Sequence, residues 1–196
     1  TAWLERGDHA EMKWIADRAH ERVVPRALLP SVRNAIVLWM NHRTTDFTPP
    51  EYVTGRVAAY AWGRDYHNVV RKAVRKLERR IREVHPHLNR YISVDTGAVL
   101  ERAFGERAGV GWIGRSTMLI HLRLGTFGSL AVMFTDLKLP VSPSAHPSRC
   151  GTCVDCVSAC PTDALTEQGL DSRKCISYWT IEHRGLIPRN MRASIG

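Results

Sequence analysis

Four cysteines lie within eleven residues of the sequence, and they constrain the fold more than any other feature. They are Cys150, Cys153, Cys156 and Cys160, with Pro161 directly after, so the spacing is C-x2-C-x2-C-x3-C-P. Cysteines this close pair poorly with one another in disulfides, whereas their soft thiolates suit iron–sulfur centres. The spacing is typical of a [4Fe–4S] site. The alternative, a zinc site, usually pairs two C-x2-C knuckles across a longer stretch, so the run predicts an iron–sulfur module.

A fifth cysteine, Cys175, follows after a gap, and we expect it to be a metal ligand as well. Two cubane clusters need eight thiolates, and the sequence has five cysteines. Either a single cluster forms, or further cysteines follow outside this sequence. The start at Thr1 and the abrupt end at Ser194–Gly196 favour a piece of a longer gene product.

The composition is that of an ordinary globular protein. The 196 residues are 44% hydrophobic, enough for one large domain or two small ones. The sequence contains no run of about 18 uncharged apolar residues, so a membrane span is not expected. The first residues lack the basic-then-apolar order of a signal peptide. We therefore expect a cytoplasmic protein with reduced thiols. There are 28 basic and 19 acidic residues, a net charge of +9, which is one property of nucleic-acid binders.

Hydrophobic periodicity and turn residues divide the chain into helices and strands. Helices are predicted at residues 1–24, 67–84 and 99–108, and strands at 32–39, 91–94, 118–124 and 129–135, the last two as a hairpin. Residues 41–56 are interpreted as a loop and residues 139–148 as a linker. The prediction is an α+β fold with a mixed α/β domain at residues 1–140 and a ferredoxin-like iron–sulfur module at residues 141–196.

The helix predicted at residues 67–84 has one apolar face and a strongly basic remainder. The basic residues are Arg71, Lys72, Arg75, Lys76, Arg79, Arg80 and Arg82. A solvated amphipathic helix explains this pattern. A surface that faces nucleic-acid phosphates explains it as well, because each Lys or Arg would release a counterion on binding.

Five segments, in this order, carry a family resemblance. They are Tyr60–His67, Asp95–Arg102, Ala108–Thr117, the cysteine run Cys150–Pro161, and Arg173–Glu182. Their order and spacing resemble the epoxyqueuosine reductases, cobalamin- and iron–sulfur-dependent enzymes of tRNA queuosine biosynthesis. Arg115 and Ser116 stand where that family more often has lysine and asparagine, and its second C-x2-C-x3-C-P motif does not follow in this sequence.

The resemblance implies a reaction. The family removes the epoxide oxygen of epoxyqueuosine at the tRNA wobble position, with electrons passing through the clusters to cobalamin. By resemblance, Asp95 is the acid that protonates the oxygen. Protonation by a positioned acid would help because an alkoxide leaves poorly at neutral pH. The alternative for Asp95 is a turn or helix cap.

The resemblance also implies ligands. It places Arg22, Tyr60, Asp95 and Thr117 near the corrin, which in this family lies between the α/β domain and the ferredoxin module. It assigns the first three cysteines of the run to one cluster, and Cys160 with Cys175 to a second. A histidine such as His67 is an alternative cobalt ligand, although a lone histidine more often has another role.

Three functions stay open at this stage. The first is the tRNA epoxide reductase, a monomer with a low-potential electron donor and no membrane association. The second is another corrinoid iron–sulfur reductase, similar to reductive dehalogenases, acting on a small organic substrate. The third is a ferredoxin-type electron-transfer module without enzymatic activity, which cobalt content would distinguish from the other two.

Overall fold

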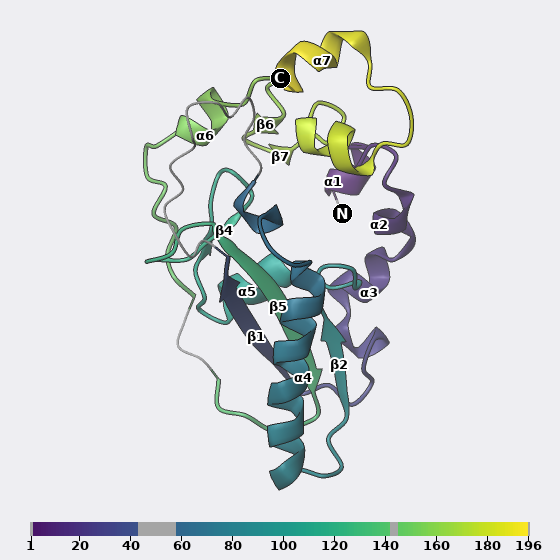
Figure 1. Cartoon of the computed structure of the whole chain (residues 1–196), viewed down its shortest axis with the longest axis vertical. Helices are drawn as coiled ribbons and strands as arrows, with labels where there is room; N and C mark the ends of the chain where they lie inside the picture. The colour runs from purple at the N-terminus through teal and green to yellow at the C-terminus, as the bar shows by residue number, and fades with distance from the viewer. Residues whose placement is uncertain (1, 43–57, 142–144, 196) are drawn as a thin grey trace. The chain divides into compact units, whose positions relative to one another are not determined.

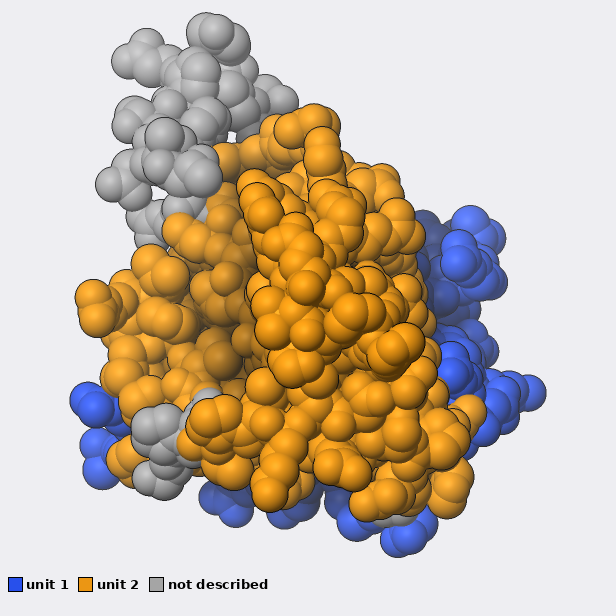
Figure 2. All heavy atoms as spheres, turned by 90° about the horizontal axis from the view of Figure 1, so that it is seen from below, with its two compact units in different colours: residues 1–19, 113–118, 148–196 blue, residues 20–112, 119–147 orange. Residues whose placement is uncertain are grey.

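The computed structural model describes residues 2–42, 58–141 and 145–195. The chain forms two compact units, coloured separately in Figure 2. Unit 1 consists of residues 1–19, 113–118 and 148–196, and unit 2 of residues 20–112 and 119–147. The loop predicted at residues 41–56 lies almost wholly outside the described residues. The boundary between residues 140 and 141 stays a prediction.

A three-stranded antiparallel sheet forms the centre of unit 2 (Figure 1). Its strands are β1 (Asn34–Asn41), β5 (Gly128–Thr135) and β2 (Arg90–Ser93), in the order β1-β5-β2. In β5, Val132 lies opposite Val37 of β1. The residues from Ala131 to Thr135 are buried because β5 has a neighbouring strand on each side and cover on both faces.

One helix covers each face of this sheet (Figure 1). The helix α4 (Tyr66–Val84) packs Val70 and Val74 on one face. The helix α5 (Glu101–Arg107) lies on the other, where the ring of Phe104 meets Phe134 with centroids 5.0 Å apart. The other short elements that lie wholly or partly in unit 2 are α3 (Ala19–Val23), η1 (Pro25–Ala27), η2 (Ala59–Ala61), β3 (Trp112–Ile113) and β4 (Leu119–Ile120).

Unit 1 joins residues from the beginning and the end of the sequence. Its elements are α1 (Ala2–Glu5), α2 (Lys13–Asp17), α6 (Asp155–Ser158), β6 (Leu165–Thr166), β7 (Gly169–Leu170), the π-helix η3 (Tyr178–Glu182) and α7 (Arg189–Ile195). The Trp3 indole donates a hydrogen bond to the carbonyl of Leu170 at 2.6 Å. The guanidinium of Arg173 pairs with the buried carboxylate of Asp8 at 3.0 Å.

Most of the predicted elements are confirmed, with two differences. Residues 1–24 form three short helices rather than one, since α1, α2 and α3 are separated by turns. The prediction that residues 118–124 and 129–135 form a hairpin is wrong. The first of these two segments contains only the short strand β4, because a bridge between His121 and Gly125 closes a tight turn directly after it. β4 pairs with β3 in a separate two-stranded sheet.

The apolar second strand of that hairpin becomes β5, which pairs with β1 and β2 instead. A strand that is apolar along its length is most stable with both faces covered and both edges paired, and the centre of a sheet offers this. None of the helices that the structure describes is long and apolar enough to cross a membrane.

Candidate active site and iron–sulfur module

Asp95 lies in a short loop of unit 2 that follows β2. Its φ is +61°, in the left-handed region that residues other than glycine seldom adopt. The main chain is held there by a hydrogen bond from the Thr96 N–H to the Val94 carbonyl at 2.7 Å. The Asp95 side chain is 61% exposed. Strained backbone that presents an exposed carboxylate is a feature that clusters at functional sites.

Two donors from the start of α4 meet the Asp95 carboxylate. The Tyr66 hydroxyl donates to its Oδ2 atom at 2.9 Å, and His67 Nε2 lies 3.1 Å from the same oxygen. The other ring nitrogen, His67 Nδ1, lies 2.8 Å from Oδ1 of Asp65. The phenol ring of Tyr66 stacks on the imidazole, with centroids 4.1 Å apart. Asp65, His67 and Asp95 therefore form one hydrogen-bonded chain, here called the Asp–His–Asp chain.

The two ring nitrogens of His67 link the two carboxylates of the Asp–His–Asp chain. A neutral imidazole donates through only one nitrogen, whereas both nitrogens of His67 face carboxylate oxygens. Hydrogen bonds from the side chain and main chain of His67 lower the pKa of Asp65, which favours its ionised form. Burial, and then the hydrogen bond to Asp95, raise the pKa of Tyr66, so its hydroxyl stays a donor.

The loop that carries Asp95 is anchored beyond these bonds. A side chain at Gly97 would overlap the hydroxyl of Ser93, which itself donates to Glu101 Oε1 at 2.6 Å. The Arg22 Nη1 atom donates to the Gly97 carbonyl at 3.4 Å, and the Arg71 Nη2 atom donates to the Thr96 hydroxyl at 2.9 Å. Burial raises the pKa of Glu101 despite the hydrogen bond from Ser93.

Three of the four residues predicted near the corrin come together in unit 2. Arg22 reaches the loop of Asp95, and the ring of Tyr60 meets Tyr66 edge-on with centroids 6.3 Å apart. Tyr60 and Trp62 are exposed aromatic rings close in sequence. Exposed rings beside a polar loop fit a planar macrocycle that carries amide groups. The fourth residue, Thr117, belongs to unit 1, where it has a φ of +62°.

All five cysteines belong to unit 1 and are free thiols. The Cys160 sulfur accepts a hydrogen bond from the Ala164 N–H at 3.2 Å. Burial raises the pKa of Cys160, but main-chain N–H groups of Thr162, Leu165 and Ala164 outweigh it, and the net effect lowers this pKa. These donors favour the thiolate, which is the form that binds iron. Across the described ranges, no three metal-ligating side chains converge, so spacing and donor chemistry carry the iron–sulfur assignment.

Arg115 holds the main chain of the cysteine run. Its guanidinium donates to the carbonyl of Gly151 at 2.9 Å and to that of Cys153 at 2.6 Å. In the sequence, Arg115 stands out only because the family more often has lysine at this position. A planar fork can donate to two carbonyls in fixed geometry, whereas an ammonium group is a point charge. Arg115 therefore shapes the loop that carries the first two cysteines.

Sequence reasoning also missed the partners of Asp95. The sequence offers His67 as an alternative cobalt ligand or as a histidine with another role, and in the structure both of its ring nitrogens face carboxylates. The available signal was the run Asp65-Tyr66-His67 at the start of the basic helix, where Asp65 is the N-cap and accepts from the His67 N–H at 2.9 Å. The link to Asp95 needs the position of β2, which the sequence does not supply.

Two family models match parts of the chain. Residues 22–96 match the model described as epoxyqueuosine reductase QueG, DUF1730, which includes the Asp–His–Asp chain. Residues 149–196 match the 4Fe-4S double cluster binding domain, which includes all five cysteines. The iron–sulfur module predicted from the cysteine spacing is therefore supported independently.

Curated relatives cover nearly the whole chain. An epoxyqueuosine reductase of Pseudomonas aeruginosa is 40% identical over 200 residues, which are 99% of this chain and 55% of the relative. An epoxyqueuosine reductase of Synechocystis is 38% identical over 187 residues, 95% of this chain and 64% of the relative. The chain belongs to the epoxyqueuosine reductase family. It spans about half to two thirds of the length of these relatives.

Solved epoxyqueuosine reductases have the same fold. The enzyme from Streptococcus thermophilus matches with a TM-score of 0.86 and 26% identity, over 99% of this chain and 52% of that one. A reductase in complex with an epoxyqueuosine-modified tRNA-Tyr stem loop matches with a TM-score of 0.83 and 30% identity, over 90% and 48%. The Bacillus subtilis enzyme, described with an aspartate-bearing catalytic loop swung out of its active site, matches with a TM-score of 0.82 and 28% identity, over 91% and 48%.

Proposed function

We propose that the protein reduces epoxyqueuosine in tRNA to queuosine, and that Asp95 donates the proton to the epoxide oxygen. The observation that carries the proposal is the Asp–His–Asp chain, which holds an exposed carboxylate on a strained loop. A relative bound to an epoxyqueuosine-modified stem loop supports the substrate. A catalytic aspartate on a movable loop in the Bacillus subtilis enzyme supports the role of Asp95.

The chemistry requires an acid at this place. Converting an epoxide to an alkene breaks two C–O bonds, forms one C=C bond and releases the oxygen as water. The balance consumes two electrons, supplied by a low-potential donor, and two protons. Once the ring opens, the oxygen carries a negative charge and leaves poorly unless it is protonated. An acid within hydrogen-bonding distance of that oxygen lowers the barrier.

The residues around Asp95 have distinct roles in this proposal. Asp95 delivers the proton from its carboxyl group, and Nε2 of His67 returns a proton to Oδ2 after turnover. Asp65 fixes the ring through Nδ1, so that the other nitrogen points at Asp95. The Tyr66 hydroxyl donates to the same carboxylate and orients it.

The cofactors belong to the proposal as well. Bound cobalamin would supply the reductive chemistry at the epoxide carbons, and Arg22, Tyr60 and Asp95 of unit 2 would hold it. A role for Thr117 follows from the family resemblance alone. The clusters would supply electrons, with Cys150, Cys153 and Cys156 in one, and Cys160 and Cys175 in the other. These assignments rest on the family resemblance, on the position of Arg22 and Tyr60 at the Asp95 loop, and on the donors to the Cys160 sulfur.

The test is turnover of a tRNA anticodon stem loop that carries epoxyqueuosine, with a chemical reductant and nucleoside mass spectrometry. We expect queuosine to form, with loss of one oxygen atom. Asp95→Asn should slow conversion per bound cobalt at least about a hundredfold, the usual contribution of a positioned acid, with an unchanged iron content. Asp163→Asn is the matched control, because Asp163 is also an exposed aspartate with positive φ.

Each alternative function predicts a different result. Normal turnover of Asp95→Asn would remove Asp95 as the acid. Bound cobalt with no conversion of the stem loop, but reduction of a small organic halide, would favour the corrinoid reductase. Iron without cobalt, and no turnover of either substrate, would favour the electron-transfer module.

A further inference from the structure

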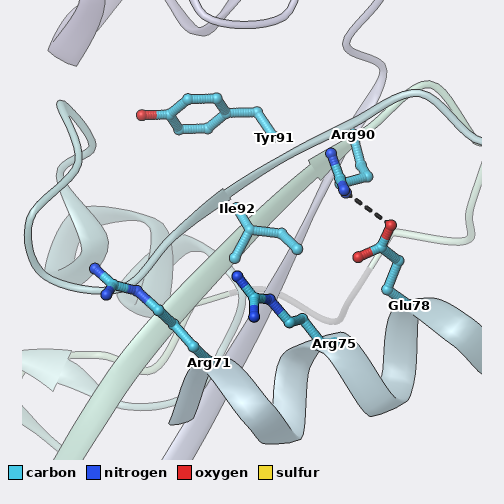
Figure 3. Close-up of a pocket in the computed structure, with 6 residues that line it drawn as sticks. All are labelled: Arg71, Arg75, Glu78, Arg90, Tyr91 and Ile92. Atoms are coloured by element: carbon cyan, nitrogen blue, oxygen red, sulfur yellow. Dashed lines mark hydrogen bonds and ion pairs between the residues drawn. The ribbon is translucent and has the colours of Figure 1, made fainter. Parts of the chain in front are cut away.

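A pocket of about 310 Å³ lies in unit 2 where α4 faces β2 (Figure 3). Its lining residues are Arg71, Arg75, Glu78, Arg90, Tyr91 and Ile92. Arg71 and Arg75 are one helical turn apart on α4 and extend toward the strand (Figure 3). Tyr91 stacks on Phe134 on the opposite face of the sheet, so charged groups dominate the helix side of the pocket.

The carboxylate in the lining is already neutralised. Oε1 of Glu78 accepts from the Nε atoms of Arg82 at 3.0 Å and of Arg90 at 2.8 Å. Burial raises the pKa of Glu78, but these two hydrogen bonds outweigh it and lower the pKa overall. The negative charge of Glu78 is therefore balanced by Arg82 and Arg90. The positive charge of Arg71 and Arg75 is left to face the pocket.

Arg75 is the residue in this pocket best placed to take a ligand. Its guanidinium makes no hydrogen bond or ion pair within the part of the chain that the structure describes, although Arg71, Glu78 and Arg90 are all engaged. Arg71 lies beside it and is fixed by its bond to the Thr96 hydroxyl. Two guanidinium groups one turn apart offer the planar donors that a phosphate accepts.

We propose that this pocket binds a backbone phosphate of the RNA substrate close to the reacting nucleotide. The inference rests on the proposed function for its substrate, and it adds a recognition site that the function does not require. Its position supports it, because Arg71 bonds Thr96, the residue directly after Asp95. A phosphate bound between Arg71 and Arg75 would hold the RNA strand next to the Asp95 carboxylate, which acts on the modified base.

The basic residues of α4 fall into groups that differ in their contacts and in whether they line the pocket. Arg82 is bound to Glu78 and donates to the Pro86 carbonyl at 3.3 Å, so it is a structural cation. Arg80 is 71% exposed and pairs with Glu83 at 3.1 Å, outside the pocket. The solvated-surface interpretation therefore suits Arg80, whereas the phosphate-facing interpretation suits Arg71 and Arg75.

The first experiment compares Arg75→Gln with the control Arg80→Gln. Each variant loses one guanidinium from the same helix. The cluster-loaded protein is titrated, without reductant, into a labelled anticodon stem loop carrying epoxyqueuosine. Arg75→Gln should weaken binding about fivefold near 0.1 M salt, and its slope of log affinity against log salt should fall by about one. Arg80→Gln should change neither. Equal losses in both variants would mean diffuse attraction and would overturn the proposal.

The second experiment identifies the phosphate. Single methylphosphonate substitutions remove the charge of one phosphate at a time from the stem loop. At one position the wild-type protein should lose affinity, whereas Arg75→Gln should lose almost none, because the partner is already missing. Independent, additive losses at every position would overturn the site.

Other outcomes distinguish an RNA phosphate site from a docking site for an acidic protein partner. They also distinguish failure of this site from failure of the proposed reduction. If Arg75→Gln binds RNA normally, and slows turnover with a protein electron donor but not with a chemical reductant, the pocket docks that donor and the proposal is wrong. If the coupled phosphate is found but no queuosine forms, the RNA site stands and the proposed reduction fails.

Discussion

Glu101 is a half-buried carboxyl group beside the loop of Asp95, and its Oε1 atom accepts from the Ser93 hydroxyl at 2.6 Å. Burial raises its pKa, and the negative charge of Asp95 adds to this, whereas the hydrogen bond from Ser93 and the charge of Arg22 lower it. A raised pKa means that the folded state binds the proton more tightly than the unfolded chain does. Glu101 therefore costs stability as the pH rises from its ordinary pKa of 4.5 through the folded value.

The variant Glu101→Gln tests this directly. Its amide oxygen still accepts the bond from Ser93, but it carries no charge. At pH 7.5 its free energy of unfolding should exceed that of the wild type by about 1 kcal/mol, and the gain should shrink below pH 4.5. Urea unfolding followed by tryptophan fluorescence at both pH values measures it. A less stable variant at pH 7.5 would show that the Glu101 charge is stabilising.

Residue-scale chemistry was only partly readable from the sequence. The aspartate was identified by resemblance, but its hydrogen bonds were not, because Tyr66 and His67 meet Asp95 only when α4 packs on the sheet beside β2. The burial of Glu78 in a basic helix was likewise invisible. It depends on Arg90, which comes from a different element.

At the scale of elements, the first part of the cysteine run, before α6, is anchored by Arg115, a residue distant from it in sequence. Arg115 donates to the carbonyls of Gly151 and Cys153, and Thr117 follows two residues later in left-handed backbone. A β-branched residue seldom adopts that conformation, so the turn at residues 114–117 is tightly determined by its surroundings. Its main chain closes with a bond from the Thr117 N–H to the Gly114 carbonyl at 2.9 Å.

We expect Arg115→Lys to loosen this loop although the charge is kept. A lysine ammonium does not reproduce the two-carbonyl geometry of the fork. The visible absorbance of the cluster should decay several-fold faster in the presence of an iron chelator, whereas the free energy of unfolding of unit 2 should stay the same. Arg123→Lys, an Arg-to-Lys change on an exposed turn of unit 2, is the control. Equal decay rates in both variants would mean that Arg115 does not position the cysteines.

Elements with their own periodicity were predicted well, and those defined by distant partners were not. The helix at residues 67–84 differs from α4 by one residue because its apolar positions repeat along the helix itself. The strand at residues 129–135 was found, but its pairing was wrong. A short continuous apolar run indicates that a segment is a buried strand, but it does not show which strands lie beside it.

At the scale of the whole molecule, both units draw on segments far apart in the sequence. Unit 1 depends on residues near its beginning, since Trp3 bonds the carbonyl of Leu170, and Asp8 holds Arg173. Mutations close to residue 1 should therefore affect the module that contains all five cysteines.

Trp3→Ala is expected to release the clusters at lower temperature. Losing a partly buried indole and its hydrogen bond should cost about 2 kcal/mol of the stability of unit 1. The measurement is cluster absorbance during heating, with Trp14→Ala as the control because Trp14 is 49% exposed. If both variants lose their clusters at the same temperature as the wild type, the start of the chain does not support the module.

The central position of β5 also has a consequence for how the protein is made. The ribosome releases β1 and β2 before β5, and neither of these two strands pairs with the other in the sheet. Until residue 135 has emerged from the ribosome, β1 and β2 cannot pair with β5, and their edges and apolar side chains stay exposed. Long-range closure of this kind is slow and leaves aggregation-prone intermediates. Expression at low temperature or with abundant chaperones should therefore raise the soluble yield more than changes at the finished surface would.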